Sequence, residues 1–410
     1  MQLPKEGLAA DDILQQLDTM KSEDVDYAGG RVFSLAYSAG EDVNDLAKAA
    51  HNRFLSANGL NMQAFPSLRR MQAEVVGMVA DLLHGGNEAA GFITSGGTES
   101  LLLSVKAARE RGWEQGIDAP EMVLPTTAHA AFEKGAKYFG VKSVRIPVGD
   151  DFKADPEAMR AAVNENTVLV VGSAPNYPQG VIDPIEALGE IALEHDCNCH
   201  IDGCMGGMIL PMMERLGDKI PLWDFRVPGV TSISADLHKY GYTAKGASVL
   251  LHRNRELRKH QTFLTENWLG GVYGSPGVLG TKSGGPIAAA WAVMNYIGEA
   301  GYLRLTKIAR EAATKLMTGL RETQGIQLVG NPEVTLIAFT FDELDAFAVG
   351  EQLRIRGWHV DQQKPPPSLH CMVNAVHEHT IEAFLDDLRE VMSGMQSGQT
   401  AEQQAYGTTE

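Results

Sequence analysis

Apolar residues recur at intervals of three and four positions between residues 63 and 83, which is the spacing of one face of an α-helix. These positions are Phe65, Leu68, Met71, Val75, Val76, Val79 and Leu82. Gly85 and Gly86 follow at once and end the pattern. The segment therefore predicts a helix that packs one face against a core.

Short apolar runs then alternate with helical patterns up to about residue 201. The expected strands are 92–94, 122–125, 143–146, 168–172 and 198–201, and the expected helices are 99–111, 130–139 and 185–195. Strands that are separated by helices need crossover connections, which favour parallel pairing with helices on both faces. The pattern predicts an α/β fold with a mostly parallel sheet.

The pattern changes after residue 283 and predicts a smaller α+β domain. Its expected helices pass through Trp291, through 305–316, and over 344–356 and 381–392, with strands at 326–329, 334–341, 359–360 and 369–373. The last residues are rich in Gln, Gly, Ser and Thr, which favours a mobile tail. The expected divisions are an N-terminal segment 1–62, a large domain 63–283, a small domain 284–392 and a mobile tail 393–410.

Composition limits the classes of partner. The chain has 410 residues, with 35 Lys+Arg against 52 Asp+Glu and a formal net charge of −17. This acidic balance argues against nucleic acid as a partner. No run of about 20 apolar residues predicts a transmembrane segment, and the first residues do not read as a secretion signal. A cytoplasmic protein is expected.

Three of the four cysteines, Cys197, Cys199 and Cys204, lie close together in the sequence. A metal site with His200 and Asp202 is one interpretation of this cluster. However, the segment reads as a strand, in which alternate side chains point to opposite faces. We expect reduced thiols and no metal.

Lys239 follows an apolar, strand-like run at 232–236, and His238 precedes it. A lysine amine among apolar and cationic neighbours loses part of its preference for the protonated form, which makes it available for a Schiff base. A lysine at the end of a strand without any chemistry is the alternative.

Three further features support a chemical site. The run ITSGGTES at 93–100 passes from a strand through a glycine turn into a helix, and free N–H groups at such a point bind phosphate. Asp202 ends a strand at the edge where open α/β sheets bind ligands. His129 lies among small residues at a helix start, where its flat ring has space for a ligand beside it. Taken singly, each has an alternative: the glycine run could be a plain turn, Asp202 could be a helix cap or a metal ligand, and His129 could be an isolated histidine without a function.

Together these features match what pyridoxal phosphate requires. The aldehyde of this cofactor needs a lysine amine, its phosphate needs a helix start, and its pyridine nitrogen needs a carboxylate that keeps it protonated.

The chain resembles the group II pyridoxal-phosphate decarboxylase family of fold type I. The resemblance extends from residue 3 to about 392 and rests on TSGGTES (94–100), AHAAF (128–132), GVIDP (180–184), HIDG (200–203), DFRV (224–227), VTSISAD (230–236), HKYGY (238–242) and KG (245–246). Within the family it is most similar to the members that cleave sphingosine 1-phosphate. The resemblance implies a seven-stranded, mostly parallel sheet, a homodimer with the active site at the subunit interface, and pyridoxal 5'-phosphate as cofactor.

The resemblance also implies roles for individual residues. Lys239 would hold the cofactor, Asp202 would pair with its ring nitrogen and His129 would stack on its ring. Further cofactor contacts would come from Ser95, Gly96, Gly97, Thr98, Ser173 and His238, and substrate contacts from Tyr37, Asn58, Asn61, Lys245, Tyr273 and Lys282, with Tyr37 also placed among the catalytic residues.

Two positions depart from the pattern of these lyases. Asn61 stands where they have histidine, so one charge-assisted contact to a substrate phosphate is absent. Lys282 stands where they have arginine, so charge is kept but the two-pronged geometry is lost. The expected reaction is cleavage of the C2–C3 bond of a phosphorylated long-chain base to an aldehyde and phosphoethanolamine. An L-amino-acid α-decarboxylase and a cofactor-binding scaffold without turnover are the alternatives.

Overall fold

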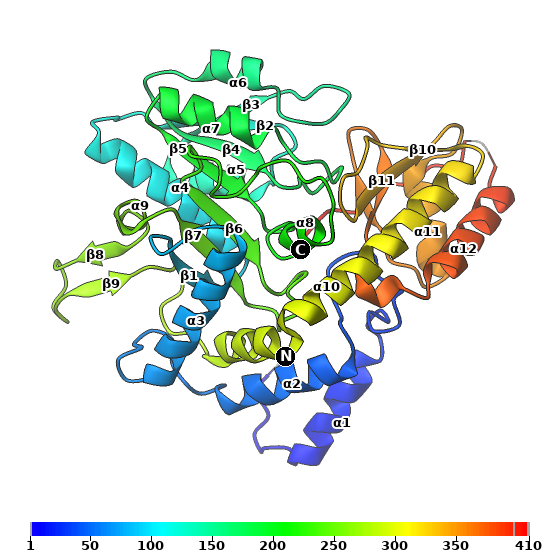
Figure 1. The fold of residues 1–410 in the computed structure, drawn as a ribbon. Helices are drawn as coiled ribbons and strands as arrows, with labels where there is room; N and C mark the ends of the chain where they lie inside the picture. Colours follow the sequence, from blue (N-terminus) through cyan, green and yellow to red (C-terminus); the bar gives the residue numbers. More distant parts are fainter. Residues whose placement is uncertain (1, 397, 408–410) are drawn as a thin grey trace.

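The structure is a computed structural model that describes residues 2–396 and 398–407. Its centre is a sheet of seven strands in the order β1-β7-β6-β5-β4-β2-β3 (Figure 1). The strands are β1 (Ala90–Thr94), β2 (Glu121–Pro125), β3 (Lys142–Ile146), β4 (Thr167–Ser173), β5 (Asn198–Asp202), β6 (Ser232–Asp236) and β7 (Ser248–His252). All neighbouring pairs are parallel except those that β7 makes with β6 and β1. The predicted mostly parallel, seven-stranded sheet is confirmed.

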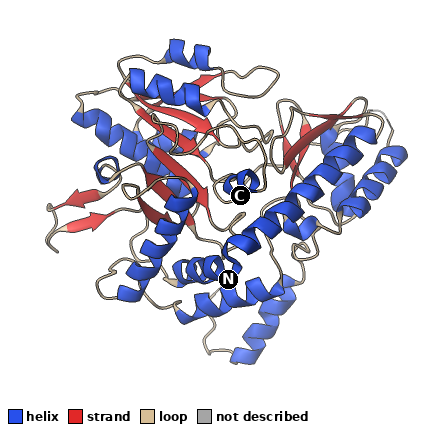
Figure 2. Ribbon diagram, in the orientation of Figure 1, coloured by secondary structure: helices blue, strands red, loops and turns tan. Residues whose placement is uncertain are grey.

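Helices cover both faces of this sheet (Figure 2). They are α3 (Pro66–Leu82), α4 (Gly97–Glu114), α5 (Ala131–Phe139), α6 (Pro156–Ala162), α7 (Ile185–Glu194), α8 (Leu210–Arg215) and α9 (Arg255–Lys259). Strand β4 shows why helices must cover both faces of the sheet. Val170 packs into one core with α3 and α7, while Leu169 and Val171 pack into another core with α4 and α5. Alternate side chains of a strand point to opposite faces, so this uninterrupted apolar strand is buried on both sides.

The helix α10 (Gly285–Glu322) connects the large sheet to a second, smaller sheet. The sequence predicts two helices here, and the structure joins them across a break at Gly298, whose φ of +57° favours glycine. The small antiparallel sheet has the order β10-β11-β13-β12, with β10 (Ile326–Leu328), β11 (Leu336–Phe341), β12 (Asp361–Gln363) and β13 (Ser368–Met372). Helices α11 (Ala346–Ile355) and α12 (Ile381–Gly394) and the 3-10 turn η1 (Ala375–His377) complete this part.

Two outlying parts expose apolar surface. Helices α1 (Ala10–Lys21) and α2 (Glu41–Arg53) precede the large sheet, and α1 buries none of its residues. The hairpin of β8 (Phe263–Thr265) and β9 (Tyr273–Ser275) projects from the left edge of the molecule in Figure 1, whereas α1 lies at its lower end. Among the described residues, no helix combines the length and apolarity needed to cross a membrane. The proposed domain boundaries and the mobility of the tail stay predictions.

Candidate active site

Lys239 lies in the turn that follows β6, at the carboxyl edge of the large sheet. Its Nζ is 3.0 Å from Oδ2 of Asp236, the buried last residue of β6. Burial disfavours the charged amine, but the attraction of Asp236, with that of Asp202, outweighs it and holds the pKa of Lys239 above its usual range. The expectation of a lowered lysine pKa is therefore wrong, because a carboxylate and not a cation is the charged group nearest to the amine.

Asp202 ends the neighbouring strand β5 and faces the same edge. Its Oδ1 accepts hydrogen bonds from the backbone N–H of Cys204 at 3.0 Å and from the Ser234 hydroxyl at 3.4 Å. Residues Asp202 and Ser234 are paired in register across β5 and β6. Adjacent parallel strands thus bring this carboxylate and Lys239 to one end of the sheet.

The turn between β1 and α4 forms the next wall. Glu99 is buried, and its carboxylate accepts the backbone N–H of Ser95 and of Val278, each at 2.6 Å, which fixes the turn. A side chain at position 97 would place its Cβ 2.7 Å from the buried Asp236 carboxylate, so the turn approaches Asp236 too closely for any residue but glycine. The N-terminus of α4 therefore opens toward the lysine.

These walls enclose a cavity of about 460 Å³. It is lined by the predicted cofactor residues Ser95, Gly96, Gly97, Thr98, His129, Asp202, His238 and Lys239, together with Tyr177, Asp236, Lys245 and Tyr406 among others. The Nδ1 atom of His129 accepts the backbone N–H of Ala131 at 3.1 Å, and burial lowers the pKa of this imidazole, so it is held as a neutral ring. Ser173 lies beside Asp202 in the sheet but does not line this cavity, and its cofactor contact stays a prediction.

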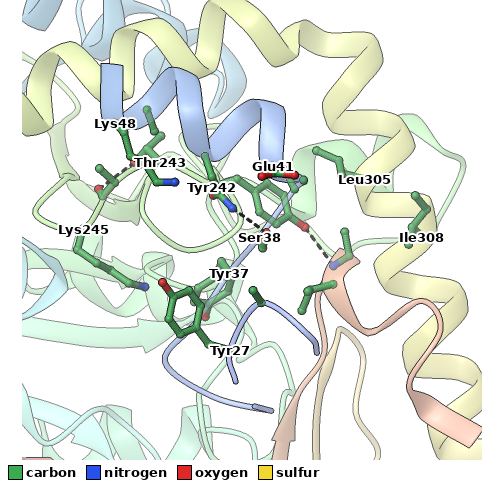
Figure 3. A pocket seen from close by; sticks show the side chains of 18 of the residues that line it. Tyr27, Tyr37, Ser38, Glu41, Lys48, Tyr242, Thr243, Lys245, Leu305 and Ile308 are labelled. Carbon is green, nitrogen blue, oxygen red and sulfur yellow. Dashed lines mark hydrogen bonds between the residues drawn. The ribbon is translucent and has the colours of Figure 1, made fainter. Parts of the chain in front are cut away.

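Lys245 connects this cavity to a second, polar cavity of about 910 Å³ that Tyr37 also lines (Figure 3). The Lys245 Nζ donates to the carbonyl of Leu35 at 2.7 Å and lies 5.1 Å from the centre of the Tyr37 ring. Lys245 is exposed to solvent at the surface of this cavity. Burial, with repulsion from Lys239, lowers the pKa of Lys245 to about 8. Burial raises the pKa of the Tyr37 hydroxyl.

The remaining predicted substrate residues do not line the cavity that contains Lys239. Asn58 pairs with Ser283 in an isolated bridge, and Gly59 donates to the carbonyl of Lys282 at 2.8 Å, which brings their two loops together. The Asn61 side chain binds its own loop through the N–H of Gln63. Tyr273 lies on the projecting hairpin. Their contacts with substrate stay predictions.

Several residues that line the cavity were not predicted from the sequence, among them Asp236, Tyr177 and Tyr406. Asp236 lies three positions before Lys239, and this short spacing is the signal that could have identified it. Tyr406 lies in the tail that was expected to be mobile, and no feature of its sequence pointed to the site.

The cysteine cluster is part of the core. Burial raises the pKa of Cys197 to about 12 and that of Cys199 further. Among the described residues there is no group of three or more His, Cys, Asp or Glu side chains that is suited to hold a metal ion.

Pyridoxal phosphate fits the residues of the 460 Å³ cavity. An amine, a buried carboxylate, a neutral imidazole and the N-terminus of a helix converge there, and these are the groups that its aldehyde, ring nitrogen, ring face and phosphate need. A side chain at position 97 would collide with the Asp236 carboxylate, so glycine keeps this part of the cavity wall free of side-chain atoms.

The fold and this site define a pyridoxal-phosphate enzyme of fold type I. Residues 1–342 match the family profile described as the pyridoxal-dependent decarboxylase conserved domain, and the chain belongs to that family. The chain is 41% identical to a sphingosine-1-phosphate lyase of Oryza sativa over 95% of its length and 74% of the relative. A solved sphingosine-1-phosphate lyase of Burkholderia pseudomallei has a TM-score of 0.92 and 40% identity, with 96% of this chain and 92% of that chain covered. A solved glutamate decarboxylase of Lactobacillus brevis, with a TM-score of 0.84, 20% identity and coverage of 96% and 94%, shares the fold.

Proposed function

We propose that this protein is a lyase that uses pyridoxal phosphate to cleave the C2–C3 bond of sphingosine 1-phosphate or a related phosphorylated long-chain base. The observation that carries the proposal is the convergence of Lys239, Asp202 and His129 on one cavity, in a chain that is similar to sphingosine-1-phosphate lyases over nearly its whole length.

The comparisons favour the lyase over the α-decarboxylase. Relatives at about 40% identity over most of both chains are named as sphingosine-1-phosphate lyases, whereas the decarboxylase with a solved structure shares 20% identity and so supports the fold alone. The lyase reading therefore rests on the more similar proteins.

The cofactor, when bound, supplies an electron sink next to the amine-bearing carbon of the substrate. The residues of the chain would hold and orient the cofactor. Lys239 would attach it through its amine, Asp202 would keep the ring nitrogen protonated and His129 would lie against the ring face. Lys245, at the junction of the two cavities, supplies positive charge toward the substrate. In the overall reaction the 3-hydroxyl gives up a proton, the C2–C3 bond breaks to release an aldehyde, and C2 gains a proton to give phosphoethanolamine.

The test is detection of products by mass spectrometry after cofactor-loaded protein is incubated with sphingosine 1-phosphate. Phosphoethanolamine together with the long-chain aldehyde is expected. Absence of both, with the cofactor bound, contradicts the lyase. Carbon dioxide released from L-amino acids would then support the decarboxylase.

We expect the activity to depend on pH through Lys245. Its amine is charged below its pKa of about 8 and attracts the anionic substrate, and the charge is lost as the pH rises through that value. Since a hydrogen bond to a charged group contributes about 1.5–3 kcal/mol, kcat/KM is expected to fall by about tenfold above this pH. The measurement is a pH profile of kcat/KM for the protein and for Lys245→Arg.

Arginine stays charged over the whole range. The fall near pH 8 should therefore be absent from the Lys245→Arg profile. An identical fall in both proteins would assign it to another group.

We propose a homodimer whose interface includes α1 and the β8–β9 hairpin. Helix α1 exposes Leu14, Leu17 and Met20, and the hairpin region exposes Trp268 and Leu269. A helix without any buried residue gains little stability in an isolated chain, and exposed apolar patches of this kind mark interaction surfaces. The predicted substrate residues Asn58, Asn61, Tyr273 and Lys282 do not line the cavity of Lys239 in one chain, which is consistent with their contribution to the site of a second copy.

Leu269→Asp is expected to convert the dimer to monomers. Leu269 is fully exposed in the single chain, and a charge that is buried in an apolar interface costs about 2 kcal/mol or more. Light scattering coupled to size exclusion measures the mass. Leu193→Asp, at an exposed leucine of α7, is the matched control and should stay dimeric. If both variants stay dimeric, the hairpin is not part of the dimer interface.

We further propose that the protein works in the cytoplasm. Its four cysteines are all free and buried, and reduced cysteines are typical of that compartment.

A further inference from the structure

The C-terminal tail lies against the small sheet. The Gln403 side chain donates to the backbone carbonyl of Gln362 at 3.1 Å, and the N–H of Gln404 donates to the Gln362 side chain at 2.8 Å. Gln362 is a buried residue of β12, and Ala401 packs on the core next to it. These contacts anchor the tail two residues before Tyr406.

Tyr406 reaches the cofactor cavity from this anchor. The centre of its ring lies 6.1 Å from that of His129, edge to face, and 5.6 Å from that of Tyr177. It lines the cavity that contains Lys239 and also lines a neighbouring cavity of about 710 Å³. The ring therefore stands at the boundary between the two.

The two cavities next to the cofactor cavity differ in chemistry. The cavity that shares Lys245 is lined by charged and polar groups, among them Lys48, Arg304 and Glu41. The cavity that shares His129, Tyr177 and Tyr406 has an apolar wall of Pro147, Val148, Phe152, Pro365 and Pro366, and its lining also includes Asp150, Asp361 and Lys364. A phosphorylated long-chain base has one anionic end and one apolar end, so the polar side suits its phosphate and the apolar side suits its alkyl chain.

We propose that the C-terminal tail is part of the active site and that Tyr406 is a specificity-determining residue, whose ring limits how far the substrate's alkyl chain extends into the apolar cavity. This proposal rests on the proposed lyase function. The ring and not the hydroxyl provides the barrier. Loss of the ring joins the two cavities and gives a longer chain additional apolar contact.

The test compares phosphorylated sphingoid bases of short and long alkyl chain. We would measure kcat/KM and, separately, dissociation constants by calorimetry. The proteins compared are the cofactor-loaded protein, Tyr406→Ala, Tyr406→Phe and a chain that ends at Gln396. For Tyr406→Ala and the shortened chain, the ratio of long-chain to short-chain affinity is expected to rise by about tenfold. The reason is that a few additional methylene groups would then contact the apolar cavity. Tyr406→Phe should keep the original ratio. Glu402→Ala, an exposed position in the same tail, is the matched control and should also keep it.

An unchanged ratio in both Tyr406→Ala and the shortened chain would overturn the proposal. A ratio in Tyr406→Phe that equals that of Tyr406→Ala would overturn it as well, because the hydroxyl would then be the determinant. Failure of the proposed lyase function would give a different result, because the unsubstituted protein would then form no aldehyde from any of the phosphorylated bases. The calorimetric ratio still tests Tyr406 in that case.

Discussion

Replacement of Lys239 by alanine is expected to lower kcat by about 10³-fold or more, because the variant lacks the amine that attaches the cofactor. The amine lies 3.0 Å from the buried Asp236 carboxylate, in a cavity that also holds Asp202 and His129. The measurement is product formation together with borohydride reduction of the cofactor-loaded protein. Mass spectrometry of its peptides should find the reduced cofactor on Lys239 and none on the variant.

Two further lysines test whether the attachment is specific to Lys239. Lys245 lines the same cavity, so labelling of Lys245 in place of Lys239 would contradict the assignment directly. Lys307→Ala changes an exposed lysine of α10 and is the control for the loss of a positive charge. It should keep full activity and full labelling.

Most strands and helices of the large sheet could be predicted from the sequence, because their buried residues recur in regular patterns. The helix predicted over 63–83 appears as α3, and its predicted apolar positions Leu68, Met71, Val75 and Val79 are buried. Strand β7 was not predicted, and it is the strand that runs against its neighbours. Its direction follows from the connection at 237–247, which contains no helix and so cannot make a parallel crossover.

Boundaries in the small domain were less predictable. The strand expected at 359–360 appears as β12 at Asp361–Gln363, while His359 forms only an isolated bridge with Val32. Strand β12 is short and has one buried side chain, Gln362, so it carries almost no apolar pattern. Its place is decided by pairing with β13, which is a contact between segments and not a local preference.

The candidate site was predictable where local motifs coincide with strand ends. Lys239, Asp202 and His129 each follow a recognisable local pattern, and the parallel sheet brings their segments to one edge. Tyr406 was not predictable, because its segment is polar and its position depends on hydrogen bonds to Gln362 on a distant strand. A tail without an apolar pattern can still be held by pairing of this kind.

Asp202→Asn is expected to keep the cofactor bound and to lower kcat by about 10³-fold, because a neutral amide cannot keep the ring nitrogen protonated. The substitution preserves size, and the amide oxygen can still accept the N–H of Cys204 and the hydroxyl of Ser234, so the fold should be unaffected. The measurement is kcat beside the stoichiometry of bound cofactor. Asp196→Asn, at an exposed aspartate just before the other end of β5, is the matched control and should keep kcat. Full activity of Asp202→Asn would show that the electron sink does not depend on this carboxylate. Asp202 would then lie at the end of its strand without a role in the reaction.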